Sequence, residues 1–292
     1  MSLSIKNLTK AFGENVAVNN VSFSLHQGEV LGLLGRNGAG KTTTLKMLLE
    51  LIPKDRGEIT WKGKPYQRKN ISIGYLPEER GLYPKSKINE QLTYFAKLEG
   101  MAASVISKEI DRWLERFEAT EYKNKLASEL SKGNQQKIQL IGTLLHNPEM
   151  IILDEPFSGL DPVNANLLSD VIREEMSKGK TIILSSHQMN QIETFCDNIV
   201  MIKKGNIIEN GKLDDIKEAY GYKNLRIKLR DSEADISDIH SFTKEDNGEW
   251  LTKAKTEEEA IHTLNAVKQK TEIKTFTLLE PTLHEIFLER MG

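Results

Sequence analysis

The stretch GRNGAGKT, Gly35 to Thr42, has the residue types and spacing of a loop that binds phosphate groups. It follows the apolar run Val30–Leu34 and opens the helical pattern TTTLKMLLELI, which is the strand–loop–helix context that such a loop requires. Glycines let backbone N–H groups approach phosphates, the lysine reaches the terminal phosphates, and the threonine hydroxyl can bind Mg²⁺. A chance glycine-rich turn is the alternative. The predicted binding residues are Gly35, Arg36, Asn37, Gly38, Ala39, Gly40, Lys41, Thr42 and Thr43.

Two neighbouring carboxylates end the apolar run MIILDEP, Met150 to Pro156. An acidic residue at the end of a buried strand is costly unless it serves a charge or a metal ion. We therefore expect Asp154 to hold Mg²⁺, directly or through water, and Glu155 to act as the general base toward an attacking water molecule. The alternative is that both residues cap the helix that follows.

The segment TIILSSH ends in His187, just beyond a third apolar run. Open α/β sheets bind ligands at the carboxyl ends of their strands, so His187 is predicted to contact a terminal phosphate and to place the water molecule. The other histidines, among them His26, His146 and His284, lack this setting. We expect them to be surface or capping groups.

The stretch LSKGNQQKIQL places Ser131 and Gly133 at the start of a helix with no acidic side chain. Helix N-termini carry unpaired N–H groups and a partial positive charge, so an anion is one expected guest. The simpler interpretation is that Ser131 is an ordinary N-cap and that the glycine eases a turn.

The elements that must position these groups alternate along the chain. Three short apolar runs are typical of buried parallel strands, and helical patterns separate them. Residues 57–65 and 198–211 have the alternation and glycine turns of edge strands or a hairpin, and residues 88–130 have a helical pattern. The prediction is an α/β fold, a mostly parallel sheet with antiparallel edge strands and an inserted helical lobe at about residues 85–135.

A change of pattern near Gly221 divides the chain into predicted domains at residues 1–220 and 221–292. The second segment contains no phosphate-type motif, and its strand and helix patterns predict a small α+β domain. Thr282 and Glu285, three residues apart before an apolar stripe, predict a capping box at the last helix.

The bulk composition fits an ordinary globular protein of roughly two domains. The 292 residues carry a formal net charge of −2, which gives no reason to expect nucleic acid as a partner. The single cysteine, Cys196, fits a reducing cytoplasm. The chain start has no apolar signal core and no run approaches the ~20 apolar residues of a membrane-spanning helix, so we expect a cytoplasmic protein.

Taken in order, GRNGAGKT, LSKGNQQ, IILDEP, SGLD and SSH resemble the motifs of ATP-binding-cassette (ABC) ATPases over residues 3 to 220. LSKGNQQ is the most discriminating motif, because other phosphate-loop proteins lack a second phosphate-binding segment at that place in the sequence. The resemblance implies ATP and Mg²⁺ as cofactors. It also implies a second ATPase subunit, identical or not, with two ATP molecules sandwiched between head-to-tail copies.

In such a dimer, Ser131 and Gly133 would face the γ-phosphate bound by the other copy. Ser158 to Asp161 match the family's loop at the dimer seam, which makes Asp161 a further nucleotide-site residue. Phe12 occupies the position of the aromatic ring that stacks on adenine, and a plain core residue is its alternative.

The sequence departs from the family pattern at two places. Lys132 and Asn134 replace a glycine and the glutamine of Leu-Ser-Gly-Gly-Gln, and Glu78 replaces a glutamine. Glu78 keeps an oxygen for Mg²⁺ but loses the amide donor and repels the γ-phosphate, which puts the hydrolysis rate and its coupling in doubt.

The wording YLPEERGLYP and EPTLHEIFLERMG is similar to that of bacterial exporter ATPases, including those for sodium, drugs or antibiotics. This resemblance implies a separate membrane permease and a peripheral position on the inner face of the cell membrane. Residues 78–100 are the predicted docking surface, with Tyr83, Tyr94 and Phe95, although these rings are also suited to packing the helical lobe. The alternatives are a soluble ABC ATPase outside transport and a phosphate-loop kinase for a small acceptor.

Overall fold

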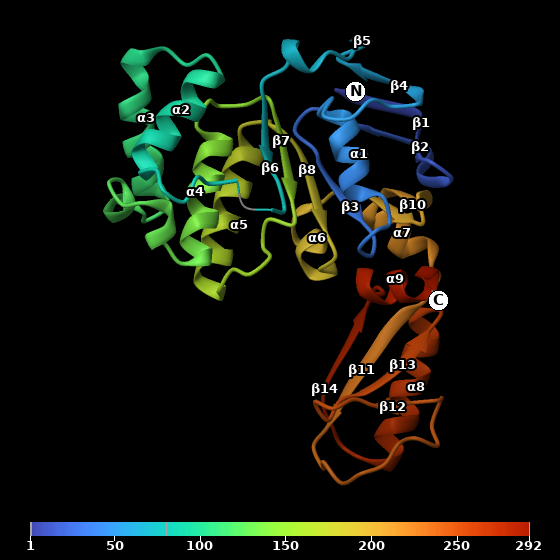
Figure 1. Ribbon diagram of the computed structural model, residues 1–292. Helices are drawn as coiled ribbons and strands as arrows, with labels where there is room; N and C mark the ends of the chain where they lie inside the picture. The colour runs from blue at the N-terminus through green and yellow to red at the C-terminus, as the bar shows by residue number, and fades with distance from the viewer. Residues whose placement is uncertain (1, 80, 292) are drawn as a thin grey trace. The chain divides into compact units, whose positions relative to one another are not determined.

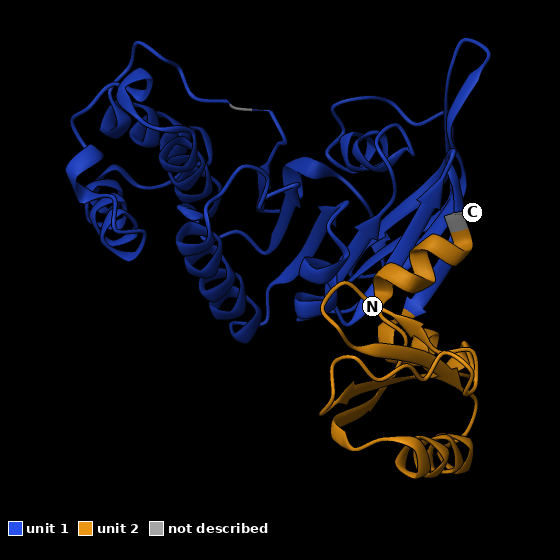
Figure 2. Cartoon of the chain, turned by 90° about the horizontal axis from the view of Figure 1, so that it is seen from below, with its two compact units in different colours: residues 1–211 blue, residues 212–292 orange. Residues whose placement is uncertain are grey.

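The computed structural model of the chain describes residues 2–79 and 81–291. They form two compact units, Met1–Gly211 and Lys212–Gly292, coloured separately in Figure 2. The sequence pattern placed the boundary at residue 220, whereas helix α7 (Leu213–Ala219) groups with the second unit. Arg80, which belongs to the predicted docking segment, lies outside the described residues.

A six-stranded sheet with the strand order β10-β9-β3-β8-β7-β6 forms the centre of the first unit (Figure 1). Strand β3 pairs in parallel with β8 and β9, and β7 pairs in parallel with β6 and β8. Every residue of β3, β7 and β8 is buried, as continuous apolar runs predict. The strands are β3 (Val30–Leu34), β6 (Ile73–Leu76), β7 (Met150–Asp154), β8 (Thr181–Ser186), β9 (Asn198–Lys203) and β10 (Asn206–Lys212).

The antiparallel strands form a four-stranded sheet of their own, with the order β2-β1-β4-β5. Helix α1 (Lys41–Leu48) joins the two sheets, because its Leu45 belongs to one apolar cluster with Ile5 of β1 and Ile152 of β7. The predicted α/β fold is therefore confirmed. The strands of the second sheet are β1 (Leu3–Phe12), β2 (Asn15–Leu25), β4 (Arg56–Trp61) and β5 (Lys64–Pro65).

The helical lobe comprises α2 (Ile88–Leu98), α3 (Ala103–Arg116) and the helix α4 (Lys132–Leu144), which contact one another. Helix α4 also packs on β6, so it ties the lobe to the central sheet. Short 3₁₀ turns occur at 68–70, 120–122 and 127–129. Two further helices of this unit are α5 (Pro162–Ser177) and α6 (Met189–Phe195), and α6 contacts β3 and β8.

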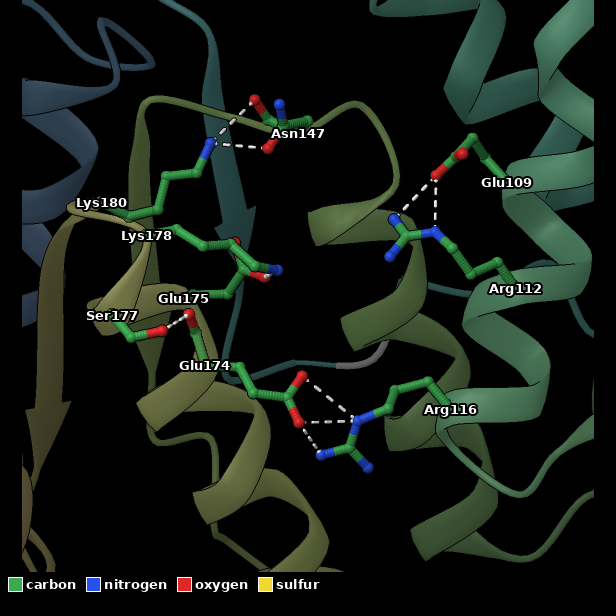
Figure 3. A network of polar contacts seen from close by, with 9 residues as sticks. All are labelled: Glu109, Arg112, Arg116, Asn147, Glu174, Glu175, Ser177, Lys178 and Lys180. Carbon is green, nitrogen blue, oxygen red and sulfur yellow. Dashed lines mark hydrogen bonds and ion pairs between the residues drawn. The ribbon is translucent and has the colours of Figure 1, made fainter.

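A side-chain contact also links the lobe to α5 (Figure 3). Arg116 of α3 donates from Nε to both carboxylate oxygens of Glu174, at 2.9 and 3.2 Å, and also from Nη2. Arg116 holds the pKa of Glu174 below its usual value. In contrast, the pair Arg112–Glu109 lies within α3 and links no two elements.

The second unit is a four-stranded antiparallel sheet, order β12-β13-β11-β14, with its own apolar cluster that includes Leu225, Ile227 and Val267. The predicted capping box is present, since Glu285 N donates to Thr282 Oγ1 at 3.2 Å and Thr282 N donates to the Glu285 carboxylate at 2.7 Å. The elements are β11 (Lys223–Leu229), β12 (Thr243–Lys244), β13 (Trp250–Ala254), α8 (Glu257–Lys270), β14 (Ile273–Leu279) and α9 (Leu283–Met291).

Within residues 2–79 and 81–291, no helix combines the length and the apolar character needed to cross a bilayer.

Candidate nucleotide-binding site

The phosphate-type loop connects the buried strand β3 to the first turn of α1. Gly40 has φ +115°, and a Cβ there would lie 2.5 Å from the carbonyl oxygen of Ala17, so only glycine fits this backbone. Gly38 has φ +77° and an open side, which leaves space above the loop. The ammonium of Lys41 donates to the Gly35 carbonyl at 2.7 Å. The loop is thus a preformed cradle with a buried cation beneath it.

A cleft of about 550 Å³ opens over this loop. Its lining includes Arg36–Thr43 and Glu78, so the structure brings Glu78 beside the loop from a distant part of the sequence. Sequence reasoning missed the rest of the lining, which comes from the start of β2 and from the turn between β9 and β10. Those missed residues are Asn15, Val16, Ala17, Lys204 and Gly205.

Asp154 lies at the carboxyl end of β7 and is 1% exposed. Its Oδ2 accepts a hydrogen bond from the Thr42 hydroxyl at 3.2 Å, and its Oδ1 accepts one from Ser185 at the end of β8. Sequence reasoning missed Ser185, although two hydroxyls ending a buried apolar strand were a usable signal. The structure therefore brings together the hydroxyl and the carboxylate that the sequence assigned to Mg²⁺.

Glu155 follows Asp154 and is also buried, with φ +50°. Its Oε2 lies 2.9 Å from His187 Nδ1 and 3.4 Å from the Ser186 hydroxyl, which donates to it. Its Oε1 lies 3.7 Å from Lys41 Nζ and has no hydrogen-bond partner in the described part of the chain. Oε2 is therefore held in place, while Oε1 is left to accept a proton or a hydrogen bond from a water molecule.

These groups suit ATP and Mg²⁺ by their chemistry. The described residues contain no cluster of three or more His, Cys, Asp and Glu side chains that could hold a metal ion alone. Mg²⁺ usually keeps few protein ligands and completes its shell with water and substrate phosphates. Thr42 and Asp154, with Glu78 in the same cleft, offer such a sparse set of oxygen ligands.

Ser131 is the N-cap of α4, and its hydroxyl accepts from the Asn134 backbone N–H at 3.3 Å. Both Ser131 and Lys132 are exposed. The capping contact of the simpler interpretation is thus present, and an anion remains a prediction. Asn134, which replaces a residue of the family pattern, donates from its side-chain amide to the Tyr122 hydroxyl at 2.8 Å. This bond fixes Asn134 to the lobe.

Asp161 caps α5 by accepting from the Asn164 backbone N–H at 2.9 Å, and this bond holds the pKa of Asp161 below its usual value. A Cβ on Gly133 would lie 3.3 Å from Asn164 Nδ2 and 3.9 Å from Asp161 Oδ2. The starts of α4 and α5 therefore lie side by side. The structure brings Ser131, Gly133 and Asp161 into one surface region.

Phe12 lies at the end of β1 and is 52% exposed, so its alternative as a plain core residue is wrong. It pairs with Asn15, which lines the cleft, and Lys10 Nζ lies 5.4 Å from the ring centroid. An exposed ring next to the cleft is available for stacking.

Comparisons with known proteins agree with this arrangement. A family model described as "ABC transporter" matches residues 18–158, and one described as "ATP-binding protein DrrA1-3-like, C-terminal domain" matches residues 211–291. The uncharacterized ABC transporter ATP-binding protein YhaQ of Bacillus subtilis is 44% identical, over 99% of this chain and 98% of that protein. The Nod factor export ATP-binding protein I of Bradyrhizobium diazoefficiens is 35% identical, over 73% of this chain and 71% of that one.

A solved structure of the ATP-binding subunit of an ABC transporter superposes with a TM-score of 0.70 at 30% identity, over 76% of this chain and 94% of that one. The fold, the buried carboxylates beside the phosphate cradle and these relatives lead to one assignment. The chain belongs to the ATP-binding subunits of ABC transporters, a family that hydrolyses ATP to power transport.

Proposed function

We propose that this chain is the ATPase subunit of an exporter and that two copies close around ATP. One observation carries the proposal: the cleft and the Ser131 region are separate on one chain. Among the described residues that line the cleft, none belongs to α4. A phosphate bound to the loop therefore does not reach Ser131, Gly133 and Asp161 of the same chain. We propose that these residues instead contact the phosphate bound to the loop of a second copy.

Within each cleft the side chains have distinct roles. Lys41 and the loop N–H groups bind the β- and γ-phosphates, and Phe12 stacks on the adenine. When bound, Mg²⁺ neutralises charge on the phosphate oxygens, and Thr42, Asp154 and Glu78 would hold it. Glu155 Oε1 orients and deprotonates the attacking water molecule.

His187 has two tasks in this proposal. Its 2.9 Å contact fixes the Glu155 carboxylate from one side. Its ring is about half exposed, so it is also accessible to a terminal phosphate. Lys132, exposed beside Ser131, adds a positive charge that suits the partner's phosphate.

The membrane permease is proposed to dock beside α2. A cavity of about 250 Å³ there is lined by Leu82, Phe95 and Leu98 from the predicted docking segment and by His146, which follows α4. Tyr83 and Tyr94 are each at least half exposed, so neither ring is consumed by packing of the lobe. This apolar hollow favours a partner segment that presents an apolar side chain.

His146 corrects one expectation, because it is not a surface group. Its side chain is 5% exposed, burial lowers its pKa, and its Nε2 has no hydrogen-bond partner within residues 2–79 and 81–291. A neutral imidazole in this cavity wall offers the docking segment one polar contact.

The export direction is supported by the Nod factor export relative. We infer that the protein lies on the inner face of the membrane, bound through its permease. The cargo is left to the permease, whose own binding site meets it.

The test is Glu155→Gln, which keeps the size of the side chain and removes the base. We expect ATP binding to persist, phosphate release to fall about 100-fold or more, and the sedimentation coefficient of the variant to increase when ATP is added. Glu149→Gln, at the opposite end of β7 and about half exposed, is the matched control and should resemble wild type.

Unchanged phosphate release in Glu155→Gln would contradict the role of the base. A sedimentation coefficient that does not change when ATP is added would contradict closure of two copies. Transfer of phosphate to a small acceptor, in place of free phosphate, would support the kinase alternative.

A further inference from the structure

Strand β14 forms one edge of the sheet in the second unit (Figure 1). It pairs with β11 on one side, from Asn224↔Leu279 to Leu229↔Ile273. In the described part of the chain, its other side has no strand partner. An edge strand of this length presents a row of unpaired N–H and C=O groups, which is a template for another strand.

The side chains of β14 lack the usual protection of an edge. Its sequence, IKTFTLL, holds one charge, Lys274, and neither proline nor glycine. Phe276 lies opposite Ile227 of the core face, yet it is 57% exposed, and Leu279, which strand alternation puts on the other face, is 55% exposed. The apolar layer of this unit is therefore left open at Phe276.

We propose that β14 pairs with β14 of a second copy of this chain, antiparallel, about a twofold axis at Thr277. Two residues then face each other across the axis when their residue numbers sum to 554, which is twice 277. Phe276 faces Leu278 of the partner subunit, and Lys274 faces Glu280 of the partner subunit. Each of these contacts occurs twice, because the pairing is symmetric.

Charge complementarity favours this register over the one with its axis at Phe276. A twofold axis at Phe276 would set Glu272 against Glu280 of the partner subunit, and like charges directly opposite are destabilising. The axis at Thr277 gives opposite charges at both ends and places the two Phe276–Leu278 apolar pairs between them. Lys274 has no acidic partner among the described residues, so it is free to take this one, while Glu280 lies 3.5 Å from Lys223 of its own chain.

The pairing extends two four-stranded sheets into one and covers Phe276 in both copies. It requires neither ATP nor the Ser131 region. It therefore goes beyond the proposed ATP-dependent closure, and each can fail without the other.

Cysteine cross-linking of the full chain without nucleotide tests the register. Directly opposed residues have Cα atoms about 4.5–5.5 Å apart, within the range that a disulfide spans. Thr277→Cys should therefore form a covalent dimer on mild oxidation. Thr275→Cys is the control, because its two copies would lie about 14 Å apart along the strands.

The native thiol does not interfere, because Cys196 is buried and burial raises its pKa, which keeps it protonated. Both Thr variants are exposed surface changes, and equal thermal midpoints would establish that each is folded. Equal cross-linking of the two variants, or none in either, would overturn the proposal.

Charge reversal provides a second readout. Adding Lys274→Glu to Thr277→Cys should lower the cross-linking rate at least about fivefold, since it places two carboxylates together at both ends. Mixing this chain with one that carries Glu280→Lys and Thr277→Cys should restore it, because both ends of the mixed pair are complementary. An unchanged rate in the first variant, or no recovery in the mixture, would refute the pairing.

Discussion

The phosphate-loop region and the Ser131 region of the first unit differ in how far their own chain completes them. At the loop, Lys41, Asp154 and Glu155 are buried, Lys41 lies within ion-pair distance of Glu155, and Thr42 of α1 donates to Asp154. At the other region, Ser131 and Lys132 are exposed, and Ser131 and Asp161 bond mainly to their own helices.

This difference teaches that burial and exposure mark two kinds of functional residue. Buried polar groups are costly, so their presence at the loop points to chemistry that repays the cost. Exposed helix starts cost little, and a role for them must come from a second molecule. The first region is therefore a binding pocket, and the second is proposed to be one side of an interface between two copies.

The largest effect is expected from a substitution in the phosphate-loop region. Lys41→Ala removes the cation beneath the cradle and leaves Glu155 Oε1 without its nearest positive charge. We expect ATP affinity to fall about 100-fold, because charge-assisted contacts are lost and carboxylate repulsion is exposed. Equilibrium binding of a fluorescent ATP analogue measures this, with Lys46→Ala on the same helix as control. Full retention of affinity would undo the phosphate-loop assignment.

A smaller and more selective effect is expected at Ser131. Ser131→Asp keeps a good N-cap, so the unfolding free energy should change by less than about 0.5 kcal/mol. The added charge repels the partner's phosphate, so phosphate release should fall at least about tenfold while ATP binding to the single chain persists.

Mixing sharpens this prediction. A Ser131→Asp chain still has its loop, and a Lys41→Ala chain still has its Ser131. Their mixed dimer therefore contains one intact site, and an equimolar mixture should recover about a quarter of wild-type phosphate release. Failure of two inactive chains to recover any activity would contradict a site shared between copies.

The smallest expected effect concerns the link between the two regions. Glu174→Gln breaks the contact of α5, which carries Asp161, with α3 of the lobe. The pair is partly exposed, so we expect a loss of about 0.5 kcal/mol of unfolding free energy at pH 7.

Arg116 lowers the folded-state pKa of Glu174, so this contribution is present above the unfolded pKa and is lost as pH falls through the folded pKa. Urea unfolding at neutral and acidic pH should therefore show a difference that shrinks in acid. Glu109→Gln, within α3, is the local control. A difference that grows in acid would contradict the assigned pair.

The sequence was sufficient for groups that sit at the ends of apolar runs. Asp154, Glu155 and His187 each follow such a run, and parallel strands bring their carboxyl ends to one edge of the sheet. Lys204 and Gly205 could not be predicted in this way, because an ordinary hairpin turn carries them and only strand order places that turn at the cleft.

His146 shows the opposite limit. It follows a helix and precedes Asn-Pro, which looks like an exposed helix end, yet it is buried within the wall of a cavity beside Arg68 and Glu99. Burial of a polar residue depends on neighbours that are distant in sequence, so local pattern alone misplaces it. The open edge at β14 escaped prediction for the same reason, since only sheet order shows which strand is outermost.

The backbone of Glu155 has a consequence for engineering. A non-glycine residue at φ +50° carries about 1 kcal/mol or more of conformational cost, which glycine would relieve. A screen that selects for heat resistance alone is therefore expected to enrich Glu155→Gly. The selected variants would be more thermostable but would no longer hydrolyse ATP.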